Sequence, residues 1–563
     1  MHDILIQGGT VIDGSGAPAR QADVAVRNGC IAAVGSNLGP AQRLVDATGL
    51  LVTPGFVDIH THYDGQATWD SQLTPSCWHG VTTAVFGNCG VGFAPVRPGA
   101  RDYLINLMEG VEDIPGTVLA EGMAWSWESF PQYLDALEKR HYTMDIGAQL
   151  PHAALRFYAM GERGADHQQH PSAAELDQMA SLAEQALHAG ALGITTSRTI
   201  KHRARDGRFT PSLTAAEPEL FAIAAALRRA GKGVLEVNSD FGEGDFAILR
   251  AACEAAGRPM SLLLLQVDNA PDLWRQTLDQ IHEARAAGLD VTGQVGAKSI
   301  GVLFGFETSR NPFETHPAWA PLLPLTPRER VARLQADAAL RERLVTERPD
   351  DALTAWFDKA FRRTFALGPQ LDYEPEASQS LAARAQREGT TAWALALQAL
   401  LADEGRGLLL HPFENYTGGD FSVVQAMLAD AATVMGLGDA GAHVGLICDA
   451  AGPTYLLKHW ARDRTRGPKL ALEMLVKKQT ADTARVYGLK DRGLLAEGLR
   501  ADINVIDFDR LALRAPEVVY DLPTGGRRLL QRADGYRHTF VAGVEVLRDD
   551  ALTGATPGRL IRG

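Results

Sequence analysis

Short apolar runs alternate with long amphipathic stretches through the middle of the chain. Each run is rich in Val, Ile and Leu and precedes a stretch with helical periodicity, which is the pattern of repeated βα units in a parallel sheet. Eight such units predict an α/β fold of the closed (β/α)8 TIM barrel type. The expected strands are residues 51–57, 81–87, 145–150, 192–197, 233–238, 261–267, 289–295 and 433–438.

The two ends of the chain have a different pattern. Residues 1–50 consist of short β-favouring segments between turn signals such as Gly8-Gly9 and Asn28-Gly29. Residues 485–550 show the same alternation of short β-favouring segments and turn signals. Chain termini commonly lie close together, and edge strands need partners. We therefore expect a small β-sandwich domain formed by both chain ends, with the barrel spanning residues 51–484.

Residues 298–406 are too long for a single βα connection. The segment begins with proline- and aromatic-rich sequence around Asn311-Pro312-Phe313 and continues with helical patterns. A long insertion on the active-site face of a barrel is most often a lid or specificity element. The alternative is a peripheral helical elaboration without a role at the site.

Composition restricts the class of protein. The 563 residues are 45% hydrophobic, enough to bury a large core, and no apolar run approaches the length of a membrane span. The 55 basic and 68 acidic side chains give a net charge of -13 with both signs interspersed, which argues against nucleic acid and membranes as partners. We expect a small-molecule substrate instead.

The cellular context is predicted from the N-terminus and the cysteines. No basic leader with a following apolar stretch opens the chain. The 5 cysteines are scattered and odd in number, which fits reduced thiols better than a disulfide framework. We expect a cytoplasmic protein, and a homo-oligomer is the default expectation at this size.

A pair of histidines marks the end of the first barrel strand. His60 and His62 are two positions apart, and residues two apart in a strand share a face, so both imidazoles can converge on one metal ion. Strands one and eight are neighbours in a closed barrel, which brings Asp439 beside this pair. The other strand ends are also polar, and they carry Cys89, His152, Ser197, Arg198, Asn238, Gln266 and Gln294.

Three stretches of the sequence resemble the amidohydrolase superfamily. They are PGFVDIHTH at residues 54–62, GDAGAH at residues 438–443 and FGNCGVGFAP at residues 86–95. The last is similar to the D-aminoacylase (N-acyl-D-amino-acid deacylase) branch, in which a cysteine replaces the bridging lysine or glutamate of relatives. WSWESF at residues 125–130 and GLLAEGLRAD at residues 493–502 extend the resemblance over nearly the whole chain.

The resemblance implies a metal-dependent hydrolase that cleaves a carbon–nitrogen amide bond of an N-acyl-D-amino-acid-like substrate. It implies that His60, His62 and Asp439 hold the metal with Cys89 as a thiolate ligand, and this donor set favours Zn(2+). Zinc lowers the pKa of a bound water, which then attacks the amide. Asp439 is the implied catalytic residue, which takes a proton from this water and passes it to the leaving nitrogen.

The sequence departs from the family pattern at two positions. Relatives have histidines at the ends of strands five and six that complete a second metal position, whereas this chain has Asn238 and Gln266 near those places. Neutral amide oxygens are poor zinc ligands, so we expect one zinc ion and leave a second one open. Glu236 shares a face with Asn238 and is an alternative ligand. Otherwise Asn238 and Gln266 bind substrate.

Three further residues are candidates for substrate binding. His443 follows Asp439 closely, and Arg198 and Lys201 follow strand four, where they can meet an anionic group. The alternatives are a histidine that caps its loop and a solvated charged loop. Both interpretations stay open at this point.

Other chemistries lack their motifs. Neither a nucleotide-binding glycine fingerprint nor a G-x-S-x-G nucleophile elbow stands in the required strand-to-helix setting. Hydrolysis by a bound water therefore remains. Two alternatives stay open: a hydrolase for a cyclic amide, an ester or a xenobiotic amide that uses the same site, and a non-catalytic binding protein.

Overall fold

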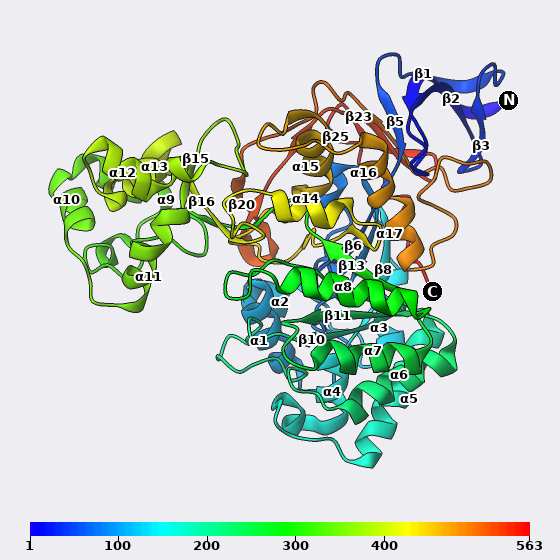
Figure 1. The fold of residues 1–563 in the computed structure, drawn as a ribbon, viewed down its shortest axis with the longest axis horizontal. Coiled ribbons are helices and arrows are strands. Elements are labelled where there is room, and N and C mark those ends of the chain that lie inside the picture. The colour runs from blue at the N-terminus through cyan, green and yellow to red at the C-terminus, as the bar shows by residue number, and fades with distance from the viewer.

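Parallel strands covered by helices form the centre of the molecule (Figure 1). A computed structural model describes residues 1–563. The strands form two hydrogen-bonded series, β6-β7-β8 and β9-β10-β11-β12-β13-β17, in which every neighbouring pair is parallel. They are β6 (Phe56–Thr61), β7 (Val81–Phe86), β8 (Asp145–Ala148), β9 (Leu150–Pro151), β10 (Gly193–Arg198), β11 (Val234–Ser239), β12 (Met260–Leu263), β13 (Val291–Val295) and β17 (Thr433–Met435).

The two series approach each other at both ends. β8 and β9 are separated only by Gln149, and Thr61 at the end of β6 forms a parallel bridge with Ala440, shortly after β17. Each of the eight expected regions contains strand residues. Because parallel pairing aligns strand direction, the segment after β17 lies beside the carboxyl end of β6.

The prediction of a single strand over residues 51–57 is wrong. The segment belongs to two sheets: β5 (Leu51–Pro54) pairs with strands from the chain ends, and β6 begins the parallel series. Gly55 separates the two strands, and a Cβ atom there would lie 2.2 Å from the Thr82 hydroxyl oxygen. The chain changes sheets at a glycine because no side chain fits at the crossing.

Helices connect the parallel strands. In α5, Ser172 and Glu175 form a capping box at the start, and Gly190 in a left-handed conformation ends the helix. No helix in the structure has both the length and the apolar character needed to cross a lipid bilayer. The helices of the body are α1 (Arg101–Glu112), α2 (Gly116–Gly122), α3 (Phe130–Glu138), α4 (His152–Met160), α5 (Ala173–Ala189), α6 (Glu217–Ala230), α7 (Asp245–Ala256), α8 (Leu273–Ala286), α14 (Ser422–Ala429), α15 (Gly452–Tyr455), α16 (Leu472–Lys478) and α17 (Ala481–Val486).

Both chain ends contribute to one 9-stranded sheet with its own apolar core. Its order is β25-β24-β23-β18-β5-β1-β2-β3, with β4 paired to β1. The expected sandwich of two sheets differs from this arrangement, because β5 and β18 join both halves by continuous hydrogen bonding. The strands are β1 (His2–Val11), β2 (Arg20–Arg27), β3 (Cys30–Gly35), β4 (Ala41–Asp46), β18 (Ile503–Ile506), β23 (Tyr536–Val541), β24 (Val544–Arg548) and β25 (Ala551–Leu552).

A buried ion network fastens this sheet to the parallel strands. Arg492 donates a hydrogen bond to Asp145 at the start of β8 (2.8 Å) and lies 4.0 Å from Asp502. Arg500 contacts both acids. The Arg492, Asp145 and Asp502 side chains are 4%, 4% and 3% exposed. The charges therefore depend on one another, since each would be costly to bury alone.

Replacing Arg492 by alanine is expected to lower the free energy of unfolding by about 3–5 kcal/mol, because Asp145 and Asp502 would lose their buried cation. Arg485→Ala removes an arginine that is 63% exposed and is the matched control, with an expected cost below about 1 kcal/mol. Urea unfolding of both variants and the wild type measures the difference. Equal effects of the two substitutions would contradict this role of Arg492.

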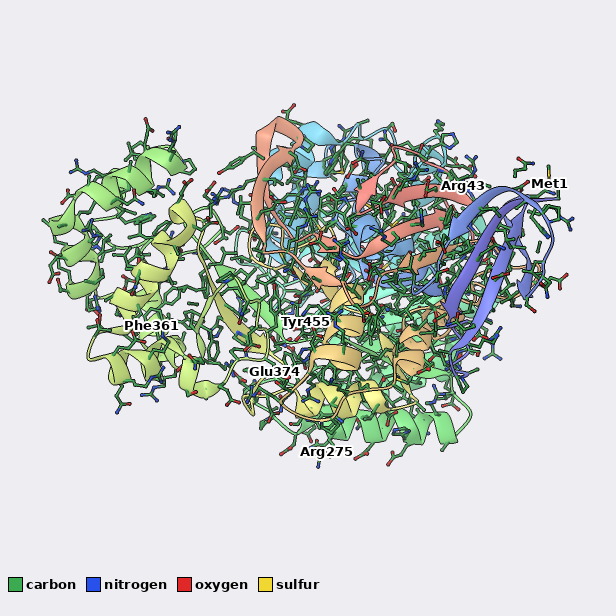
Figure 2. All side chains as sticks on the ribbon, turned by 90° about the horizontal axis from the view of Figure 1, so that it is seen from above. Met1, Arg43, Arg275, Phe361, Glu374 and Tyr455 are labelled. Carbon is green, nitrogen blue, oxygen red and sulfur yellow. The ribbon has the colours of Figure 1, made fainter.

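The segment after β13 forms a lobe that projects from the body (Figure 1). We call residues 300–414 the insertion lobe. β14 (Ile300–Phe304) and β15 (Phe365–Leu367) pair antiparallel with β16 (Leu408–Glu414), and the lobe has a separate apolar core. Figure 2 shows Phe361 inside the lobe and Glu374 near its junction with the body. Its helices are α9 (Pro327–Ala336), α10 (Ala338–Thr346), α11 (Ala352–Ala360), α12 (Leu381–Glu388) and α13 (Ala392–Gly405).

Candidate metal centre

Four side chains meet at the carboxyl ends of the parallel strands. His60 Nε2 lies 3.3 Å from Asp439 Oδ1 and 3.4 Å from the Cys89 sulfur, and His62 Nε2 lies 3.6 Å from the same Asp439 oxygen. The donor atoms of His60, His62 and Cys89 all lie within 4.8 Å of one another. Ligands of a tetrahedral zinc ion are roughly 3.3–3.8 Å apart, so these spacings fit coordination of one ion.

The loop after β17 is shaped to place Asp439 at this point. The Asp439 amide donates to the His60 carbonyl oxygen (3.0 Å), and the His62 amide donates to the Ala440 carbonyl oxygen (2.7 Å). Asp439 has a left-handed backbone, with φ of 45°. Such strain persists only where the surrounding structure holds it, and it is common at functional sites. Gly441 permits the close approach, because a Cβ atom there would lie 2.6 Å from the His62 carbonyl oxygen.

Acceptors behind the two histidines determine the direction of their rings. His60 Nδ1 lies 2.9 Å from Gln294 Oε1 and donates to it, because a carboxamide oxygen only accepts. His62 Nδ1 faces Glu112 Oε1 at 3.4 Å. Both rings therefore turn Nε2 toward Asp439 and keep Nδ1 on the opposite side, an arrangement that suits metal-binding histidines.

Buried carboxyl groups surround the four side chains. Burial raises the pKa of Asp58 and that of Asp64 to about 7, and it raises the pKa of Glu236 to about 8. Asp439 differs: burial alone would raise its pKa, but the neighbouring imidazoles bring it far below its usual value. The site concentrates several acids around few cations, which favours a bound divalent ion.

Several buried polar atoms here lack a hydrogen-bond partner. Buried polar atoms are nearly always paired, so unpaired ones indicate a ligand site. Together with the mixed imidazole, thiolate and carboxylate donors, they fit zinc or a similar divalent metal, which His60, His62, Cys89 and Asp439 would hold. The unpaired atoms are Oδ2 of Asp58, Nδ1 of His62, Oε1 of Glu112 and Oε1 of Glu236.

Asn238 lies beside the Cys89 sulfur. Its amide nitrogen is 3.5 Å from Cys89 Sγ and 3.4 Å from His202 Nε2. The amide nitrogen is therefore a donor to the sulfur and not a metal ligand. Glu236 lies behind the ligand set, because its Oε1 is 3.8 Å from Nδ1 of His60 and its Oε2 accepts a hydrogen bond from the Cys89 amide (3.1 Å).

Arg198 and Lys201, expected to meet an anionic substrate group, are paired within the protein. Arg198 donates to Asp245 (2.8 Å) and is 8% exposed. Lys201 pairs with Glu414 of the insertion lobe and is 38% exposed. The structure thus uses both cations to hold loops together, and a contact of either with substrate stays a prediction.

Gln266 and His443 occupy different surroundings. The Gln266 side chain accepts from the Thr417 amide (3.2 Å) and donates to the Pro271 carbonyl oxygen (3.4 Å), so its hydrogen bonds go to loops. His443 Nε2 lies 3.5 Å from Glu112 Oε2, and its side chain is 26% exposed. Of the two, His443 is the one that approaches His62, because both face the same acid, Glu112.

Two residues of the site, Glu112 and His202, are missing from the expectations above. A signal for Glu112 exists: α1 has a helical apolar stripe whose last position holds an acid, and a buried acid requires a partner. His202 has no comparable signal, because it lies in a charged run after β10. The buried positions of α1 are Leu104, Leu107, Met108, Val111 and Glu112.

The C-terminal part of the chain supplies a wall of the site that the sequence pattern did not predict. β20 (Glu517–Leu522) and β21 (Gly526–Leu530) form a hairpin, and the Leu529 amide donates to the Val444 carbonyl oxygen (2.6 Å). A cavity beside Asp439 is lined by the loop that follows it and by residues 528–531. The end of the hairpin thus lines a cavity that Asp439 also borders.

Comparison with known proteins places the chain in a family. The pattern of the amidohydrolase family matches residues 43–547. The chain belongs to the amidohydrolase family. N-acyl-D-glutamate deacylase of Alcaligenes xylosoxydans xylosoxydans is 30% identical over 575 residues, which cover 100% of this chain and 96% of that protein.

Two solved structures share the fold over 100% of both chains. D-aminoacylase, which has a binuclear metal center, matches with a TM-score of 0.66 and 25% sequence identity. N-acyl-D-glutamate deacylase from Bordetella bronchiseptica, complexed with zinc and a phosphonate inhibitor, matches with a TM-score of 0.66 and 24% identity.

These relatives confirm the superfamily and its D-aminoacylase branch. This amidohydrolase is an enzyme that hydrolyses carbon–nitrogen bonds. The alternative of a non-catalytic binding protein is set aside. The 30% identical relative is named for a small-molecule substrate, which agrees with the expected class of partner.

Proposed function

We propose that this amidohydrolase removes the acyl group from an N-acyl-D-amino-acid-like compound, releasing a carboxylate and an amine. The observation that carries the proposal is the convergence of His60, His62, Cys89 and Asp439 at donor spacings of 3.3 to 3.6 Å. The 30% identical relative acts on N-acyl-D-glutamate by its name, which supports the class of substrate.

The side chains divide the work of the reaction. When bound, zinc polarises the amide carbonyl and lowers the pKa of water. Asp439 is ionised, because the imidazoles hold its pKa low, and it accepts the proton of the attacking water. It then delivers this proton to the leaving nitrogen as the carbon–nitrogen bond breaks. Asn238 and His443 border the ligand set and would contact the substrate.

We propose a single zinc ion. Asn238 donates to the Cys89 sulfur, Glu236 lies behind His60, and Gln266 is bonded to loops. A second ion would therefore have few ligands besides those of the first. D-aminoacylase, in contrast, has a binuclear metal centre. The number of zinc ions per chain, measured by metal analysis, tests whether this protein differs from it.

The proposed architecture follows the strand pairings. We propose a closed (β/α)8 barrel over residues 51–484, a β domain from residues 1–50 and 485–550, and a lid function for residues 298–406. The bridge between Thr61 and Ala440 supports the closure. A cytoplasmic location and a homo-oligomeric state stay predictions.

A second candidate substrate class is favoured by the charges around the site. Lys201, Arg198 and Lys298 pair with Glu414, Asp245 and Asp449, so their charges are already neutralised. A substrate without a carboxylate beside the scissile bond suits such a site, because it needs no free cation. A cyclic amide, an ester or a xenobiotic amide fits this description.

A substrate panel tests the proposal. The zinc-loaded enzyme is expected to release amine from N-acetyl-D-amino acids with acidic and neutral side chains. The matched controls are the L-enantiomers and the N-acetyl-D-amino-acid primary amides, in which an amide replaces the carboxylate. Faster turnover of compounds without the carboxylate would favour the second candidate. No turnover of this panel, nor of a matching set of cyclic amides, esters and xenobiotic amides, by protein with bound zinc would contradict both.

A further inference from the structure

Glu112 is a buried acid that faces two histidines of the site. Its Oε1 lies 3.4 Å from His62 Nδ1, and its Oε2 lies 3.5 Å from His443 Nε2. The Glu112 side chain is only 1% exposed. Neither Glu112 Oε1 nor His62 Nδ1 has any other hydrogen-bond partner. A buried hydrogen-bond acceptor and a buried nitrogen that can donate, neither with another partner, therefore face each other.

The backbone fixes Glu112 in this position. It is the last residue of α1, and its carbonyl oxygen accepts a hydrogen bond from the His443 amide. The next residue, Asp113, accepts hydrogen bonds from the Gly445 amide (3.2 Å) and the Ser309 hydroxyl (2.9 Å). The end of α1 thus holds the loop after Asp439 and the first part of the insertion lobe.

We propose that Glu112 is a positioning residue that orients His62 for metal binding and holds His443 beside it. The inference rests on the proposed function in one respect, which is that His62 is a metal ligand. The Glu112 carboxylate accepts the Nδ1 proton of His62, which fixes the tautomer that presents Nε2 to the cation and makes Nε2 a stronger donor. The second carboxylate oxygen keeps His443 at the exposed edge of the site.

A merely structural role of Glu112 has a different consequence. Asp58, Asp64 and Glu236 are buried nearby, and the Asp439 side chain is 11% exposed, so the metal-free site already contains several acids. A glutamine at position 112 keeps an oxygen that can accept the Nδ1 proton of His62, so the metal-free protein loses a charge but not this hydrogen bond. A positioning role therefore predicts weaker metal binding with an undiminished metal-free fold, whereas a structural role predicts loss of the fold.

Glu112→Gln is the decisive variant, because it keeps the size of the side chain and removes its charge. We expect the dissociation constant for Zn(2+) to rise about 10- to 100-fold, measured by competition with a chromophoric chelator. The metal-free variant should still fold and unfold in a cooperative thermal transition, because glutamine keeps an acceptor for His62 Nδ1. Glu109→Gln is the matched control on the same helix, since Glu109 is 21% exposed and pairs with Arg205; it should leave both measurements unchanged.

Cobalt substitution provides a second measurement at full metal occupancy. The visible spectrum of the Co(2+) form reports ligand geometry and is expected to change in Glu112→Gln and to stay constant in Glu109→Gln. A wild-type zinc affinity and cobalt spectrum in Glu112→Gln would overturn the proposal, and so would a metal-free Glu112→Gln protein that does not fold. Absence of zinc binding in the wild type would instead contradict the proposed function.

Discussion

Replacing Asp439 by asparagine is expected to reduce kcat about 10²- to 10⁴-fold on whichever amide of the panel the wild type hydrolyses best. The asparagine amide has nearly the same shape but cannot accept a proton from water. The substitution also removes the one carboxylate that lies within 3.6 Å of both imidazole Nε2 atoms. Steady-state kinetics measured at saturating zinc give the size of the loss.

Metal analysis of the Asp439→Asn protein separates the two roles of this carboxylate. Retained zinc with lost turnover assigns the loss to proton transfer, and lost zinc assigns it to ligation. Asp403→Asn is the control, because Asp403 is 70% exposed and pairs only with the exposed Arg406. Turnover of Asp439→Asn within about tenfold of the wild type would remove Asp439 from the mechanism.

The convergence of the four candidate ligands could be predicted because each of them lies at or after the end of a strand. His60 and His62 are two residues apart, so strand geometry alone puts them on one face. Asp439 is far away in sequence, and only the expected neighbourhood of the first and last strands brings it close. Two contacts hold Asp439 beside the histidines: the bridge between Thr61 and Ala440, and the hydrogen bond from the Asp439 amide to the His60 carbonyl oxygen.

The environment of the ligands could not be predicted in the same way. Glu112 reaches His62 from a helix, and Leu529 reaches Val444 from a C-terminal hairpin. Such contacts depend on the tertiary path of loops and helix ends, for which the sequence has no periodic pattern. Only the acid on the apolar stripe of α1 gave a local signal.

The hydrogen-bond partners that loops supply to the predicted substrate-binding residues could not be predicted either. Gln266 follows a strand as expected, yet the Thr417 amide takes its side-chain oxygen. Lys201 is paired by Glu414 at the end of β16, a strand of the insertion lobe. A sequence shows which residues carry charge, but it does not show which oppositely charged side chain each one pairs with in the folded protein. The break at Gly55 is similar, because Thr82 excludes a side chain there only after the fold has formed.

Removing the divalent ion is expected to abolish turnover and to destabilise the enzyme by an amount that grows with pH. In the metal-free protein burial raises the pKa of Glu236 to about 8 and that of Asp58 and of Asp64 to about 7. Burial alone would lower the pKa of His62, but Glu112 and other acids raise it to about 9. Each value lies above that of the unfolded chain, so the stability from these protons is present at low pH and lost as the pH rises through about 7 to 9.

Bound zinc reverses this dependence, because it stabilises the deprotonated ligands and acids. At a thousandfold excess over its dissociation constant, an ion that binds only the folded state contributes about 4 kcal/mol. Thermal unfolding of chelated and zinc-loaded protein between about pH 6 and pH 8 should therefore show a gap that widens with pH. Glu236→Gln removes the acid with the highest of the raised carboxyl pKa values and should flatten the pH dependence of the metal-free protein. A gap that is constant over this range, or no gap at all, would contradict a metal bound among these buried acids.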